Sequence, residues 1–384
     1  MEEGKESRRD EASYGVSHRA RTRVSAAGGL DVRLRALQLG LGLVRLGPVL
    51  ILLLLIAVMA LLTPYFLTER NIQNIFTQTS VIAILAIGQL LVIVSRGIDL
   101  SVGAVLGLST VVGALAYEGS LHSGAAVIVV MLGLGTGIGL LNGLVYVYGR
   151  LPNSIINTLA MLYAAQGIAL ILSHGNTIEG MPTSVNTLGR GFVGIVPVSA
   201  ILVGGVAAFA VLFTRKMKWG RWIYAVGGNS EAASRVGIPV RRVIVSVFAI
   251  SGACAGLAGI VTAGQTSAGY GLAGQFSELD SIAAVIIGGA SFLGGRGTVT
   301  SSLVGAFIIG CLRNGLDLLG VYPTWQLVAV GAVTLLAVLL EVLRAYLERR
   351  FRVAQAIIQD EGPAPGTWNS LPGQTPVTEA EGVR

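Results

Sequence analysis

Polar and charged side chains stand at a few positions inside stretches of the chain that are otherwise apolar. These residues are Asp99, Asn142, Gln166, Asp280, Arg313, Asn314 and Asp317. An unpaired polar group in apolar surroundings is costly, so each of them needs a partner or a polar path. Asp99 and Asp280 are expected to open helices, where a carboxylate either caps free amide groups or borders such a path. Arg313 and Asp317, four residues apart, predict an ion pair within one helix.

The sequence shows no pattern of catalytic or metal-binding residues. Its three histidines are scattered and form no H-E-x-x-H pair, and there is no nucleophile elbow. Cys254 and Cys311 both lie inside apolar segments, so neither a disulfide framework nor a thiol–metal site follows. The phosphate-binding pattern G-x-x-x-x-G-K-[ST] is also absent. We therefore expect no metal and no ATPase site in this chain.

Membrane-spanning helices must position the polar residues. The chain is 53% hydrophobic and 12% charged, whereas a soluble domain is about 25% charged. Uncharged runs such as 49–62 and 81–94 approach the ~20 residues that cross a bilayer. These runs are apolar on every face and do not alternate, which excludes a β-barrel. The sequence predicts an all-α polytopic membrane protein.

We expect about ten transmembrane helices within a domain over residues 47–347, flanked by polar, disordered tails at 1–46 and 348–384. The eighth segment is short and polar at its start, so it either crosses fully or re-enters. The predicted segments are 48–63, 75–95, 98–117, 124–148, 152–172, 193–214, 243–263, 279–293, 299–319 and 324–345.

An internal similarity links the two halves of this domain. The segments DLSVGAVLG (99–107) and DSIAAVIIG (280–288) share an initial Asp and a Gly eight residues later. Their positions open the third and the eighth predicted helix from opposite sides. This arrangement indicates an inverted 5+5 repeat, a construction common among transporters.

Basic residues follow one side of the predicted membrane topology. With a cytoplasmic N-terminus, the tails, Arg96, Arg150, Arg296 and the loop 215–242 lie inside, and only Arg70 and Arg190 lie outside. This asymmetry predicts that both termini are cytoplasmic. It also accounts for the net charge of +7 without nucleic-acid binding.

Glycines recur at helical spacing in two of the predicted helices. Gly135, Gly139 and Gly143 follow one another every four residues and fail the G-x-G-x-x-G spacing of a phosphate-binding loop. They predict close approach of a neighbouring helix. The same interpretation applies to Gly288 and to a second series, which comprises Gly252, Gly256 and Gly259.

The stretch YAVGGNSEAASRVGIPVRR, residues 224–242, is a polar and basic island in this apolar chain. Asn229 or Ser230 can cap a helix, Glu231 lies in its first turn, Gly237 can adopt a left-handed C-terminal conformation, and Pro239 ends the helix. A loop that only sets topology would need the charges and not the capped helix. The island therefore indicates a docking element for a cytoplasmic partner.

Several segments carry a resemblance to a known family. EAASRVG (231–237) fits the E-A-A-x-x-x-G loop through which permease subunits of bacterial ABC importers contact their ATPases. GIDLSVGAVLGLS (97–109), AVGGNSEAASRVGI (225–238) and ELDSIAAVIIGGASFLGGRGTVTSSLVGA (278–306) look like signature segments of the ribose/xylose/galactoside-type sugar permeases. The resemblance covers residues 45 to 347.

The resemblance implies a pore in a bacterial plasma membrane, built by a homodimer or by two similar permeases. Two cytoplasmic ATPase subunits would hold ATP and Mg²⁺, and an extracytoplasmic binding protein would deliver the sugar. The ATPase-coupling helix would contain Asn229, Ser230, Glu231, Ala232, Ala233, Arg235 and Gly237, and the translocation path would be bordered by Asp99, Ser101, Gly103, Asn142 and Asp280.

Three other functions remain open at this point. An ion-coupled secondary transporter would also have ten helices and inverted halves, although it would need paired carboxylates or broken helices at mid-membrane. A permease of the same class could carry branched-chain amino acids, nucleosides or a furanone signal. A membrane-embedded enzyme is the third alternative, and it lacks a catalytic motif.

Overall fold

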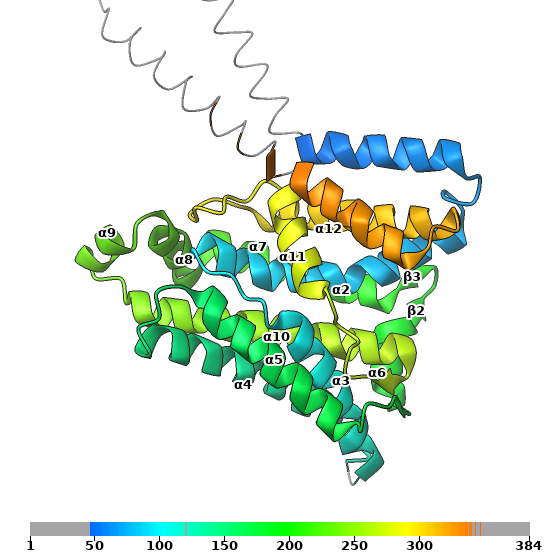
Figure 1. Ribbon diagram of the computed structural model, residues 1–384, viewed down its shortest axis with the longest axis horizontal. Helices are drawn as coiled ribbons and strands as arrows, with labels where there is room; N and C mark the ends of the chain where they lie inside the picture. Colours follow the sequence, from blue (N-terminus) through cyan, green and yellow to red (C-terminus); the bar gives the residue numbers. More distant parts are fainter. Residues whose placement is uncertain (1–46, 120, 337, 340–341, 343–345, 347–384) are drawn as a thin grey trace, which may run out of the picture. The chain divides into compact units, whose positions relative to one another are not determined.

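The computed structural model describes residues 47–119, 121–336, 338, 339, 342 and 346, almost all within one unit, Arg45–Glu341. The predicted tails at 1–46 and 348–384 lie outside the described residues. The elements, in chain order (Figure 1), are a helix at Gly47–Leu62, α2 Glu69–Val94, α3 Val102–Gly119, α4 Gly124–Tyr148, α5 Ser154–Leu172, β1 Ile178–Glu179, α6 Thr183–Arg190, β2 Phe192–Val193, β3 Val196–Pro197, α7 Val198–Lys216, α8 Lys218–Gly228, α9 Ser230–Arg235, α10 Val240–Thr266, β4 Ala268–Gly269, α11 Ser277–Ile287, α12 Val299–Leu318 and a helix at Pro323–Leu336.

The structure confirms a polytopic helical protein. Among the described residues, seven helices are long and apolar enough to cross a membrane: α2, α3, α4, α5, α7, α10 and α12. The helices at 47–62 and 323–336 are apolar but shorter, and α11 is shorter still. Each of the ten predicted segments thus overlaps a helix, although three of these helices are shorter than the ~20 residues of a full crossing. The few strands form two two-stranded antiparallel pairs, β1 with β4 and β2 with β3.

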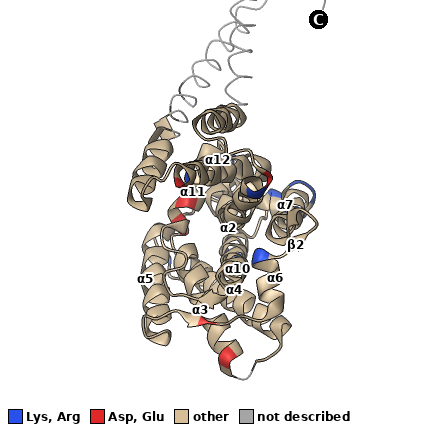
Figure 2. Ribbon diagram, turned by 90° about the vertical axis from the view of Figure 1, so that its right-hand side faces the viewer, with Lys and Arg blue, Asp and Glu red and all other residues tan. Residues whose placement is uncertain are grey.

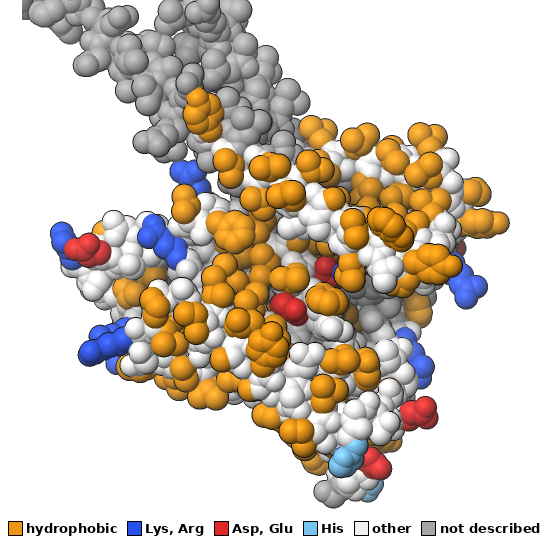
Figure 3. All heavy atoms as spheres, in the orientation of Figure 1, with side chains coloured by type: hydrophobic (Ala, Val, Ile, Leu, Met, Phe, Trp, Pro, Cys, Tyr) orange, Lys and Arg blue, Asp and Glu red, His pale blue; other side chains and the backbone are white. Residues whose placement is uncertain are grey.

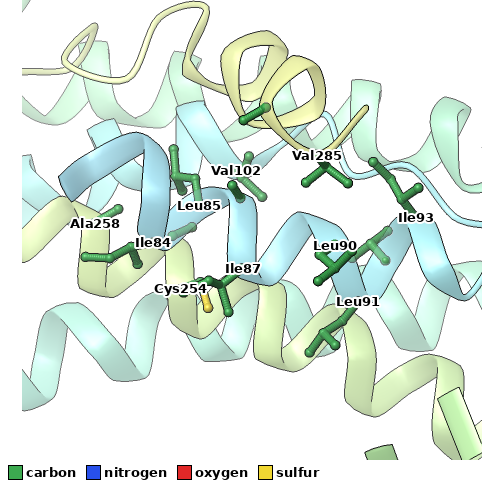
Figure 4. Packing of buried hydrophobic residues seen from close by; sticks show 14 of the residues in the cluster. Ile84, Leu85, Ile87, Leu90, Leu91, Ile93, Val102, Cys254, Ala258 and Val285 are labelled. Atoms are coloured by element: carbon green, nitrogen blue, oxygen red, sulfur yellow. The ribbon is translucent and has the colours of Figure 1, made fainter. Parts of the chain in front are cut away.

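Helix α2 lies at the centre of the bundle. In the most apolar 18-residue stretch of α2, 83% of the residues are buried, whereas the corresponding share for α5 is 17%. Its side chains, among them Ile87 and Leu90, pack against Cys254 and Ala258 of α10 and Val285 of α11 (Figure 4). From Ile82 to Val94 every residue of α2 is buried, as expected for the part of a helix that protein surrounds on all faces.

The two glycine series meet each other. A β-carbon on Gly139 of α4 would lie 2.9 Å from backbone atoms of Gly252 in α10, and one on Gly135 would lie 2.8 Å from the Cα of Gly256. The two backbones are therefore nearly in contact, which only glycine permits. Gly143 continues this contact against α10. Gly259 instead faces α3, and Gly288 faces the first turn of α12.

The eighth predicted segment is discontinuous. Helix α11 has 11 residues, a length of about 16 Å, half of the ~30 Å hydrocarbon layer. The chain before it is not helical: β4 pairs with β1, and the following residues descend beside α3, where Gly271 meets Gly107 and Gly274 meets Gly103. Irregular backbone at membrane depth is tolerated because protein covers it.

The elements outside the bundle gather at its two ends (Figure 1). Helices α8 and α9 mark one end, and α6, β2 and β3 mark the other. Side chains of Lys and Arg lie at these ends in Figure 3, and hydrophobic side chains cover the surface between them. This distribution is the one expected of a unit that crosses a membrane from end to end.

Candidate functional site

Asp99 lies in the non-helical stretch between α2 and α3, and it is 1% exposed. Its Oδ1 accepts hydrogen bonds from the backbone N–H and the hydroxyl of Ser101, at 3.0 and 2.7 Å. Its Oδ2 accepts one from Ser251 Oγ of α10 at 3.0 Å. The side-chain amide of Gln89 bonds the backbone N–H and C=O of Asp99, at 3.2 Å each, in the amide orientation that satisfies both groups.

The network of Asp99 continues into α4 and α5. Asn142 Nδ2 donates to Ser101 Oγ at 2.9 Å, and Asn157 Nδ2 donates to the backbone oxygen of Asn142 at 3.0 Å. The Ser154 hydroxyl bonds both backbone polar groups of Ile98, at 2.8 and 2.9 Å. All these hydrogen bonds join residues of the transmembrane unit to one another. Asp99, Ser101 and Asn142 therefore come together. Their hydrogen bonds attach the non-helical stretch between α2 and α3 to the neighbouring helices α4, α5 and α10.

Asp280 belongs to a different cluster. It lies in the first turn of α11, where no side chain caps the helix, so the capping interpretation of Asp280 is wrong. Its carboxylate pairs with Arg313 Nη2 of α12, with N–O distances of 2.9 and 2.7 Å. Asp317 instead accepts a hydrogen bond from Gln326 at 2.6 Å. The ion pair predicted between Arg313 and Asp317 is thus replaced by one across two helices, because a buried carboxylate on α11 requires a partner.

Glu278 completes this second cluster, and sequence reasoning missed it. The residue is 8% exposed, and its carboxylate lies beside Gly103 of α3, where a β-carbon would collide with it. Gly103 thus permits α3 to approach Glu278 and Gly274. The one signal in the sequence was an acidic residue two positions before Asp280 in an apolar region. We call Glu278, Asp280 and Arg313 the acidic–arginine cluster.

The acidic–arginine cluster lies between the two ends of the bundle. Acidic side chains are visible in a hollow at the middle of the hydrophobic face in Figure 3, where Figure 1 shows α11. In Figure 2, viewed from the end that carries α6 and β2, the acidic part of α11 lies between α12 and α5. Among the described residues, none of the hydrogen bonds in the network around Asp99 involves Glu278, Asp280 or Arg313.

The polar island forms the predicted capped helix. Asn229 Oδ1 accepts a hydrogen bond from the Ala232 N–H at 3.0 Å and caps α9, which spans the six residues Ser230–Arg235. Glu231 lies in the first turn and forms an exposed ion pair with Arg235 at 2.6 Å. Ala233 is buried at 4% exposure. Gly237 has φ of +81°, the left-handed conformation that ends the helix.

Arg96 ties this island to the rest of the unit. Its Nε donates to the backbone oxygens of Gly227 and Leu293, at 2.7 and 2.9 Å, and its Nη2 donates to that of Gly228 at 2.7 Å. The N–H of Gly295 also donates to the Val94 oxygen at 2.8 Å. The end of α2, the junction of α8 and α9, and the loop between α11 and α12 are thus held together at one end of the bundle.

Comparisons with known proteins agree with this architecture. A family model described as "Branched-chain amino acid transport system / permease component" matches residues 71–338. The ribose import permease protein RbsC of Bacillus subtilis is 40% identical over 304 residues, which cover 77% of this chain and 92% of that protein. No solved structure gives a significant match.

Other relatives match a similar share of this chain. The D-allose transport system permease protein AlsC of Escherichia coli is 39% identical over 297 residues, 77% of this chain and 90% of that protein. The galactose/methyl galactoside import permease protein MglC of Escherichia coli is 33% identical over 311 residues, 77% of this chain and 93% of that protein. The chain therefore belongs to the sugar permease family of ABC importers.

Proposed function

We propose that this chain is the membrane subunit through which a monosaccharide delivered by an extracytoplasmic binding protein enters the cytoplasm. Hydrolysis of ATP, with Mg²⁺, takes place on a separate ATPase subunit. The observation that carries the proposal is the similarity to import permeases named for ribose, allose and galactose, which extends over nine tenths or more of each relative. Two copies of the chain form the pore, in a bacterial inner membrane with both termini inside.

Helix α9 is the docking element for the ATPase in this proposal. It is capped at both ends, and its Glu231–Arg235 pair is exposed to solvent. Because Arg96 joins the α8–α9 junction to the end of α2 and to the loop after α11, a displacement of α9 reaches both elements. These contacts support a mechanical connection between ATPase and pore.

The proposal includes ten crossings arranged as two inverted halves. Asp99 and Asp280 both stand near the start of a helix that follows non-helical backbone inside the bundle. Helices interrupted by non-helical backbone in corresponding positions of the two halves are typical of inverted-repeat transporters. The partners of the two residues differ: hydroxyl groups bind Asp99, and a guanidinium binds Asp280. In our proposal Asp99, Ser101 and Asn142 shape the path by fixing the break, and Asp280 borders it.

Uptake by the assembled importer tests the transported class. The permease is produced with its ATPase and binding protein in cells that lack other sugar importers, and uptake of D-ribose, D-xylose, D-galactose and L-leucine is measured. We expect ATP-dependent uptake of one or more sugars and none of leucine. Leucine uptake would assign the chain to amino acid transport, and uptake that follows an ion gradient would assign it to secondary transport.

Substitution of Gly237 tests the docking role of α9. Gly237→Val forces a β-branched residue into the left-handed conformation, and we expect normal insertion with loss of uptake and of ATPase co-purification. Gly228→Ala is the matched control, because Gly228 lies in the same island, has no positive φ and has nothing within 4 Å of the position that a β-carbon would take. Full uptake by Gly237→Val with a bound, responsive ATPase would contradict a docking role.

A further inference from the structure

The acidic–arginine cluster is placed where lipid cannot satisfy it. Asp280 and Arg313 have side chains 5% and 32% exposed, so one end of the pair reaches the surface of the bundle. The surrounding exposed residues are apolar, with Leu279 at 53%. Charged groups on such a face pair with each other or line a water-filled cavity. Asp280 and Arg313 meet the first condition by pairing, and the exposed part of the Arg313 side chain is the part that a water-filled path would satisfy.

The cluster also has unused hydrogen-bonding capacity. Arg313 donates through Nη2 to Asp280, whereas its buried Nε has no hydrogen-bond partner among the residues that the structure describes. An unsatisfied buried donor is costly and calls for an explanation, such as a water molecule bound beside it. The carboxylate of Glu278 adds acceptors on the side of α3.

The backbone that leads into α11 is strained next to this cluster. Phe276, which directly precedes α11 and lies two residues before Glu278, has a φ of +67°, a value that a bulky residue rarely adopts, and such strain concentrates at ligand-binding positions. Phe276 and Tyr270 on this segment are 41% and 40% exposed. An exposed aromatic ring on the segment that leads into α11 offers a flat apolar surface for the C–H face of a sugar.

We infer that Glu278, Asp280 and Arg313 form the station at which a sugar in transit is held by its hydroxyl groups. This inference rests on the proposed function. A neutral polyol needs both donors and acceptors, which a guanidinium and two carboxylates supply together. The Asp280–Arg313 pair balances its own charge, so neither of its members needs an ion as a partner.

Cysteine accessibility tests whether water reaches the station. Leu279→Cys and Phe276→Cys are made in a background of Cys254→Ala and Cys311→Ala, with Leu212→Cys of α7, 54% exposed, as the matched control. We expect a water-soluble methanethiosulfonate reagent to modify positions 279 and 276 faster than 212, and an excess of transported D-ribose to slow modification at 279 and 276 alone. Equal rates at all three positions, or no protection by D-ribose, would overturn the inference.

Charge variants test whether the cluster does more than hold α11 against α12. The double variant Asp280→Arg with Arg313→Asp keeps an ion pair and exchanges the two charges between α11 and α12. We expect Asp280→Asn and Arg313→Gln each to lower D-ribose uptake by at least about tenfold at unchanged membrane levels. We expect the exchange also to keep the membrane level and not to restore the uptake. Asp317→Asn, one turn away on α12, serves as the control with near-normal uptake.

These outcomes separate the station from the proposed function. If the unmodified permease with its partners fails to take up D-ribose or any other sugar tested, the proposed function fails. If it transports D-ribose and the charge exchange also restores uptake, the pair is structural only and the station is overturned.

Discussion

Arg96 pairs a strained backbone with a well-bonded side chain. Its φ is +69°, in the left-handed region, while its guanidinium donates to three backbone oxygens. We predict that the free energy of unfolding of Arg96→Gly exceeds that of Arg96→Ala by about 1 kcal/mol, because both variants lose the side-chain bonds and only glycine removes the strain. Arg96→Gly should therefore unfold at the higher temperature. Thermal unfolding of the detergent-purified proteins measures this difference.

Arg96→Lys provides the control for the side chain. It keeps the charge and the strain, but an ammonium group cannot replace the planar fork that reaches three carbonyls on two segments. We expect its stability to fall between those of the unmodified protein and Arg96→Ala. A glycine variant no more stable than the alanine variant would show that the backbone at position 96 is not left-handed.

The contact between α4 and α10 is set by glycine at single positions. A β-carbon on Gly139 would collide with the Phe248 oxygen and lie 2.9 Å from Gly252, whereas Gly137, on the same helix, has nothing within 4 Å. We predict that Gly139→Ala lowers the free energy of unfolding by about 1–3 kcal/mol through overpacking, and that Gly137→Ala raises it by about 0.5–1 kcal/mol. Unfolding of both variants in the same detergent measures the two changes in free energy. Equal changes for Gly139→Ala and Gly137→Ala would contradict the prediction.

The helical elements were largely predictable, because hydropathy and local caps depend on neighbouring residues alone. Asn229 and Gly237 took the predicted conformations, and each apolar segment overlaps a helix. The discontinuity before α11 was not predictable in detail, since its extended half is stabilised by α3 and β1, which are distant in sequence. The partner of Arg313 was missed for the same reason: spacing favours Asp317, and tertiary packing brings Asp280 closer.

Across the whole transmembrane unit, the two ends differ in their basic residues. Arg96 and the loop 215–242 lie at the end marked by α8 and α9, and Arg190 closes α6 at the other end. The excess of Lys and Arg in short loops marks the cytoplasmic side. We therefore predict that α9 is cytoplasmic and that α6, within 174–192, is external.

Two single cysteines test this orientation in the background that lacks Cys254 and Cys311. Ser230→Cys in α9 and Thr187→Cys in α6 both stand at exposed positions. In intact cells, with the outer membrane permeabilised where there is one, an impermeant thiol reagent should modify position 187 and leave 230 unmodified. In inside-out vesicles the pattern should reverse, because the α9 end then faces the reagent. Modification of 230 in intact cells would invert the topology, and it would place α9 on the side where no ATPase could reach it.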